Sequence, residues 1–194
     1  MSIEALIEKD RWSEARALLR QALKREPRHH WLLTRMSLTY YEQRLYRDAL
    51  KYSERAFAEA PECPLVLWDY AGALQMLERH SEALDLYARL VTRGVDAIAA
   101  DPCGEGRARA RGIVSDSHYR ASLSLKAVGN DEASLSAFEH CLDLRGPAGP
   151  RLRNEGARLE AERHRVRRSS FWEQLRTESP HLTGIESTSW RSTS

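Results

Sequence analysis

The chain has 194 residues, a length that fits one domain or one short repeat array and excludes two large domains. Its 30 basic and 28 acidic residues leave a formal net charge of +2, so the chain as a whole lacks the positive field of a generally nucleic-acid-binding or anionic-membrane-binding protein. Hydrophobic residues make up 42% and charged residues 30%, which is the composition of a folded chain and not of a disordered one.

The N-terminal residues and the cysteines predict a cytoplasmic protein. The first ten residues carry three acids and no apolar stretch of signal-peptide length, and charges interrupt every later apolar run well before it could span a membrane. Cys63, Cys103 and Cys141 are an odd, widely spaced set without a CxxC pair. We therefore expect reduced thiols and no disulfide framework.

A period of 34 residues runs through the chain. Ala15, Ala49 and Ala83 follow one another at this spacing, and each comes directly after an acidic residue. Ser134 takes the same place in a fourth copy, but it lies 51 residues after Ala83, which is one period plus 17. The extra residues predict an insertion near 93–114, with a turn followed by an early start of the next helix.

Each copy is predicted to be a pair of helices. Leu33, Met36 and Tyr40 form one helical stripe in the segment before the second copy, and similar stripes precede the third and fourth copies. Small residues on both helices allow the two to approach closely. Pro27 and Pro61 end second helices, because proline cannot continue the hydrogen-bond ladder.

This pattern resembles the tetratricopeptide repeat (TPR) family, in which a helix–turn–helix of 34 residues carries bulky and small residues at set positions. The matching residues are Tyr40, Ala49, Ala56 and Pro61, then Trp68, Tyr70, Ala83 and Tyr87, then Gly129, Phe138 and Cys141. The resemblance implies an all-α solenoid, a right-handed superhelix of antiparallel helix pairs, with the first helices lining a concave groove.

Residues 1–148 are accordingly divided into four units, at about 1–28, 30–62, 64–94 and 105–146. A basic helix that caps the array is predicted over 149–177, and the Ser/Thr-rich end at 178–194 is expected to be disordered.

No catalytic motif is present. The chain has no GxGxxG, P-loop, HExxH or GxSxG pattern, and no two of its seven histidines stand at helical ligand spacing. We therefore expect no enzyme, no cofactor and no metal site, and we interpret the histidines as structural or solvated. Cys103, in a turn with two glycines, is interpreted as an inert thiol, with a redox-sensitive thiol as the alternative.

The resemblance places a set of first-helix residues in the groove, where aromatic and arginine side chains would suit protein binding. These residues are Thr34, Arg35, Leu38, Tyr41, Trp68, Gln75, Tyr119, Arg120 and Lys126. The alternative is that many of them pack between neighbouring units. TPR domains that grip a chaperone carboxylate use Lys and Asn here, and this chain has Thr34 and Leu38 at the corresponding places, so a clamp of that type is not supported.

The leading functional hypothesis is a non-enzymatic adaptor that binds an unidentified peptide or protein in the groove. A second hypothesis is a nucleic-acid or acidic-ligand binder that uses the basic residues Arg151, Arg153, Arg158, Arg163, Arg165, Arg167 and Arg168. For that helix, the alternative of a solvated capping helix is favoured over nucleic-acid or acidic-ligand binding. A third hypothesis is a self-assembling scaffold in which the stripe Leu152, Leu159 and Val166 pairs between chains.

The insertion carries three alternating arginines. We interpret Arg107, Arg109 and Arg111 as a solvated face, with an anion or acidic-peptide contact left open.

Overall fold

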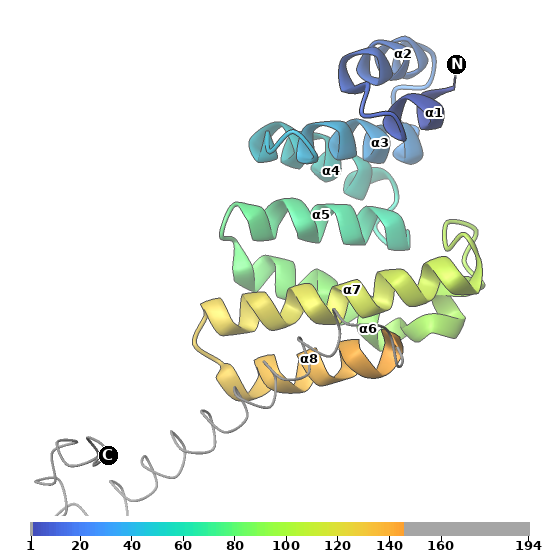
Figure 1. The fold of residues 1–194 in the computed structure, drawn as a ribbon. Helices are drawn as coiled ribbons and strands as arrows, with labels where there is room; N and C mark the ends of the chain where they lie inside the picture. The colour runs from blue at the N-terminus through green and yellow to red at the C-terminus, as the bar shows by residue number, and fades with distance from the viewer. Residues whose placement is uncertain (1, 146–194) are drawn as a thin grey trace, which may run out of the picture. The chain divides into compact units, whose positions relative to one another are not determined.

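A computed structural model describes residues 2–145, and all regular secondary structure in this part of the chain is helical. The helices are α1 (Ile3–Ile7), α2 (Trp12–Arg25), α3 (His30–Tyr41), α4 (Tyr46–Glu59), α5 (Pro64–Met76), α6 (His80–Ala99), α7 (Gly106–Ala127) and α8 (Asp131–Arg145). They stack as successive pairs in an all-α solenoid (Figure 1). None of these helices is long and apolar enough to cross a membrane. The predicted capping helix at 149–177 and the tail at 178–194 lie outside the described residues.

The turn inside each helix pair repeats one backbone conformation. Its key residue has a positive φ, and this residue is Asp10 (56°), Arg44 (60°), Glu78 (61°) and Gly129 (82°) in successive pairs. These residues are 34, 34 and 51 apart, so the backbone repeats with the spacing of the sequence. The amide that follows donates back to the first helix, as Leu45 N–H does to the Tyr40 carbonyl at 3.0 Å.

Small residues lie where the two helices of a pair meet. Ala49 and Ala83 are fully buried. The Ser37 hydroxyl donates to the carbonyl of Ala49 at 3.0 Å across the α3–α4 pair. The Ser134 hydroxyl donates to the carbonyl of Ser122 at 2.8 Å across the α7–α8 pair. The small side chains therefore bring one backbone within hydrogen-bond reach of the other helix, which confirms the predicted close approach of the two helices.

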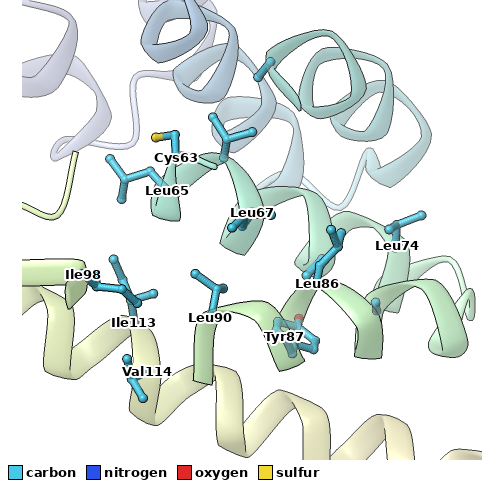
Figure 2. Close-up of a cluster of buried hydrophobic side chains, with 14 of the residues drawn as sticks. Cys63, Leu65, Leu67, Leu74, Leu86, Tyr87, Leu90, Ile98, Ile113 and Val114 are labelled. Carbon is cyan, nitrogen blue, oxygen red and sulfur yellow. The ribbon is translucent and has the colours of Figure 1, made fainter. Parts of the chain in front are cut away.

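The main core lies between α5, α6 and α7 (Figure 2). Leu67 of α5 faces Leu90 of α6, Leu74 lies further along α5, and each of the three is at most 1% exposed. Full burial of a leucine side chain stabilises a fold by about 1.5–3 kcal/mol. Tyr87 is also fully buried, and its hydroxyl donates to Gln75 Oε1 at 3.1 Å, so the polar end of the ring keeps a partner inside the core.

The first half of the insertion is helical, where the sequence predicted a turn. A helix end was expected at Gly94, and Gly94 does leave helical geometry (φ 70°, ψ 174°), but the chain returns to helix over 95–99. The reason is Ile98, which is fully buried in the core beside α7. After the turn, α7 begins at Gly106, where an early helix start near Glu105 was expected.

Candidate functional site

The first helices of three successive pairs border a hollow of about 350 Å³ that opens to solvent. We call it the first-helix groove, and its lining residues are Ser37, Leu38, Tyr41, Glu42, Trp68, Asp69, Gly72 and Arg120. A Cβ atom at Gly72 would lie 3.4 Å from Arg120 Nη1 and 3.6 Å from Tyr41 Cε2. Because glycine carries no side chain, Arg120 and Tyr41 approach α5 from its two sides and the floor of the groove stays open.

A hydrogen-bond network fixes the aromatic and basic side chains of the groove. Arg120 donates from Nε to Asp116 Oδ2 at 2.6 Å and from Nη1 to the Tyr41 hydroxyl at 2.7 Å. Trp68 Nε1 donates to the same oxygen of Asp116 at 2.7 Å. The Arg120 guanidinium carbon lies 5.7 Å from the ring centroids of both Trp68 and Tyr41, within cation–π range. Residues from α3, α5 and α7 therefore hold one another in a set orientation.

Asp69 is the electrostatically unusual residue of the groove. Its Oδ2 atom is buried and has no hydrogen-bond partner among the described residues. Burial raises the pKa of Asp69 from 3.8 to about 7, against the opposing influence of Arg35, Arg109 and Arg120, while Glu42 raises it further. A buried acceptor without a donor is costly and rare in folded proteins, and Asp69 lines an open hollow. The wall of the hollow therefore contains a buried carboxyl whose Oδ2 atom is not satisfied within the described residues.

The charges around Asp69 follow the repeat. Arg35, Asp69 and Arg120 are 34 and 51 residues apart, which is the spacing of their units, so they occupy one position of the first helix in three successive pairs. Arg35 binds Glu4 of α1, with Nε 2.9 Å from Oε1. The result is a row of alternating charge along the first helices, with Asp69 between two arginines and Arg35 partly neutralised by Glu4.

A second cluster lies at the helix starts and consists of His30, Cys63 and Cys103. The His30 Nε2 and the two Sγ atoms all lie within 4.8 Å of one another. Burial, together with the neighbouring Cys63, Asp101 and Glu105, raises the pKa of the Cys103 thiol to about 12. In the metal-free protein this favours the protonated thiol.

Comparison with known proteins identifies the repeats in the middle of the chain. Residues 34–102 match the family model of the tetratricopeptide repeat. Residues 34–102 are therefore tetratricopeptide repeats. The fold of the chain is similar to a crystal structure of MamA protein, with a TM-score of 0.60 and 17% identity over 95% of this chain and 94% of that one. A second crystal structure of MamA aligns with a TM-score of 0.45 and 15% identity over 75% of this chain and 95% of that one. No curated protein matches the chain.

Tetratricopeptide repeats are generally binding or scaffold modules, so the assignment supports a role in protein–protein interaction or as a scaffold. At this low identity, the likeness to MamA shows the fold alone.

Three of the predicted groove residues of this TPR array are buried and take part in packing. Thr34 is 2% exposed and its hydroxyl donates to the carbonyl of His30 at 2.9 Å. Gln75 is 9% exposed and donates to the backbone carbonyl of Arg120 at 2.8 Å. Arg35 is also 9% exposed, and its guanidinium carbon lies 5.2 Å from the ring centroid of Trp31. These three side chains are therefore largely buried, and Gln75 contacts the next first helix, α7.

The other predicted residues divide into two groups. Leu38, Tyr41, Trp68 and Arg120 line the first-helix groove together. Tyr119 and Lys126 do not line it: the Tyr119 ring lies 6.0 Å from that of Phe138, and Lys126 is exposed in the last turn of α7. The predicted basic patch and the predicted self-association stripe, at 151–168, lie outside the described residues.

Two arginines of the insertion, which was predicted to present a solvated face, contact other side chains. Arg107 pairs with Asp96 at 2.7 Å, with both side chains well exposed. Arg109 lies 3.6 Å from Glu105, and its guanidinium carbon is 5.7 Å from the ring centroid of Trp68. Arg109 therefore contributes to the charge around the groove, which the sequence interpretation did not include.

Proposed function

We propose that this protein is an adaptor that binds a peptide or protein segment of a partner in the first-helix groove. The observation that carries the proposal is the buried Asp69 oxygen without a donor, in a hollow lined by Trp68, Tyr41 and Arg120. Tryptophan, tyrosine and arginine are the residues that most often dominate protein-binding energy.

The groove is prepared for binding before a partner arrives. Trp68, Tyr41 and Arg120 are held by their mutual hydrogen bonds and by Asp116, so little side-chain freedom remains to be lost on association. Ordering one long side chain at an interface costs about 0.5–1.5 kcal/mol, and a groove that is already ordered avoids this cost.

Asp69 adds a chemical requirement for the partner. Its Oδ2 atom is buried and unsatisfied, so an amide, hydroxyl or ammonium donor of a partner that enters the hollow and reaches this atom would relieve the desolvation of the carboxyl. We therefore propose a partner segment that places a hydrogen-bond donor over Asp69 and an apolar or aromatic group beside Trp68. A cytoplasmic location is part of the proposal and rests on the odd number and wide spacing of the cysteines.

The test compares the proteins captured by three forms of the full chain: the wild type, the groove double variant Tyr41→Ala/Arg120→Ala, and the control Arg47→Ala/Lys51→Ala. Both control residues are exposed on α4, outside the groove. Each captured protein is quantified by mass spectrometry, and circular dichroism checks that the variants keep the helical content of the wild type.

The proposal expects at least one protein that the wild type and the control retain equally and that the groove variant loses by about tenfold or more. A hot-spot substitution of about 2 kcal/mol corresponds to a loss of this size or larger. Capture of the same proteins in the same amounts by a folded groove variant would rule out the groove as the binding site.

A further inference from the structure

The starts of the first helices bring together three metal-ligating side chains. His30 is the first residue of α3, Cys63 is the N-cap of α5, and Cys103 lies in the turn before α7. They are 33 and 40 residues apart in the sequence. Because the solenoid stacks successive first helices side by side, residues at the starts of different helices become neighbours (Figure 1).

The distances between the three side chains are close to those of a shared metal ion. His30 Nε2 lies 3.4 Å from Cys103 Sγ, and all three ligand atoms lie within 4.8 Å of one another. In a tetrahedral zinc site, Zn–N bonds of about 2.1 Å and Zn–S bonds of about 2.3 Å put nitrogen and sulfur about 3.6 Å apart and two sulfurs about 3.8 Å apart. The His30–Cys103 pair therefore stands close to the zinc separation, and Cys63 Sγ lies within 4.8 Å of both, about 1 Å from the distances that a shared ion requires.

We propose that His30, Cys63 and Cys103 bind one Zn²⁺ ion, with a fourth position left to a water molecule or to another exogenous ligand. Two thiolates and one imidazole form a soft ligand set, which selects Zn²⁺ over the hard cations Mg²⁺ and Ca²⁺. These three residues are the group that meets metal-ligand distances within the described part of the chain.

The neighbouring carboxylate of Asp101 is already engaged. Asp101 Oδ1 accepts the backbone N–H of Cys103 at 2.8 Å, and its Oδ2 accepts from Arg93 at 2.8 Å. Asp101 thus shapes the turn that carries Cys103 and leaves the ligand set at three. A three-ligand site with an open position is the arrangement that allows zinc to take up a further ligand.

Glycine at position 104 is part of this arrangement. A Cβ atom there would overlap the backbone carbonyl of Ile98, so only glycine allows the chain to turn tightly after Cys103. The turn is therefore fixed from both sides, by Gly104 and by the Asp101 carboxylate. Zn²⁺ bound here would join the starts of α3 and α5 to this turn and stabilise the array in proportion to its occupancy.

The test uses the full chain, purified with a phosphine reductant, stripped of metal by a chelator, and titrated with Co²⁺. Bound Co²⁺ with cysteine ligands gives a thiolate-to-metal charge-transfer absorption in the near ultraviolet and strong visible bands when its geometry is tetrahedral. Displacement by Zn²⁺ then gives the zinc affinity. The variants are Cys103→Ser and His30→Gln, both at half-buried positions, and the control is Cys141→Ser, which removes the one cysteine outside the cluster.

The proposal expects one Co²⁺ per chain with the charge-transfer absorption, a clearly weaker absorption in Cys103→Ser, and affinities at least about tenfold lower in both cluster variants. The control should bind as the wild type does, and Zn²⁺ should raise the melting temperature of the wild type but not of Cys103→Ser. The proposal is overturned by a reduced wild type without the charge-transfer absorption, by the same absorption and affinity in both cluster variants, or by a chain that forms a Cys63–Cys103 disulfide in air but binds no Co²⁺ when reduced.

Discussion

Replacing Asp69 by asparagine keeps the size of the side chain and removes its titration. Burial raises the pKa of this carboxyl to about 7 in the folded protein, against 3.8 in an unfolded chain. The folded state therefore holds the proton more tightly. The resulting stabilisation is fully present below pH 3.8 and is lost as the pH rises through the window up to about 7. At about 1.4 kcal/mol per pKa unit, the complete loss amounts to about 4 kcal/mol.

The Asp69→Asn variant lacks this loss, so its stability relative to the wild type should rise with pH. Between about pH 5 and about pH 8, the free energy of unfolding of the wild type should fall by about 2–3 kcal/mol more than that of the variant. Any cost of the unsatisfied asparagine amide is the same at both pH values and cancels from the comparison. Urea unfolding followed by circular dichroism measures both proteins at both pH values. A wild-type-to-variant difference that does not change with pH would refute a raised pKa for Asp69.

Four further substitutions test the packing and the backbone, each through the free energy of unfolding measured in urea. Gly94→Ala should lower the free energy of unfolding by about 1–3 kcal/mol, because φ 70° and ψ 174° suit only glycine. Gly112→Ala, at an open position inside α7, should raise it by about 0.5–1 kcal/mol. Effects of the same sign would contradict the break at Gly94. Ala49→Leu should lower the free energy of unfolding by about 1–3 kcal/mol or more, because the larger side chain cannot fit between α3 and α4. An unchanged urea midpoint would contradict that contact. Tyr87→Phe should lower the free energy of unfolding by about 1–2 kcal/mol, because the Gln75 amide oxygen is left without its buried donor.

The fold could be predicted because its signals are local and repeated. Small residues such as Ala49 and Ala83 report a contact between helices that are adjacent in the sequence, and this contact recurs in each unit. The positive φ of Arg44 and Glu78 could not be predicted in the same way, because neither side chain favours that conformation. There the two helices on either side of the turn impose the backbone geometry.

The candidate groove could be predicted only in part, because burial within it depends on contacts between units. Gln75 is on the expected helix, but its side chain turns into the packing between α5 and α7, where it meets the Arg120 carbonyl and the buried Tyr87. Arg109 was assigned to solvent because the insertion gave no register with which to place it beside Trp68. Sequence spacing gives the face of a helix, and the neighbouring unit decides which side chains on that face remain accessible.

The repeat register offers a signal for one candidate site but not for the other. Adding 34 to position 35 gives 69, and adding 51 gives 120, so the row Arg35, Asp69 and Arg120 is readable from the sequence once units are superposed. A lone acid between two arginines in such a row would then have marked Asp69. His30 and Cys63 also stand at nearly equivalent helix starts, but Cys103 belongs to the inserted residues, which have no counterpart in the other units. Its place beside them depends on the return of the chain to helix after Gly94, where Ile98 is buried, and on the turn at Gly104, where the Ile98 carbonyl leaves no room for a side chain.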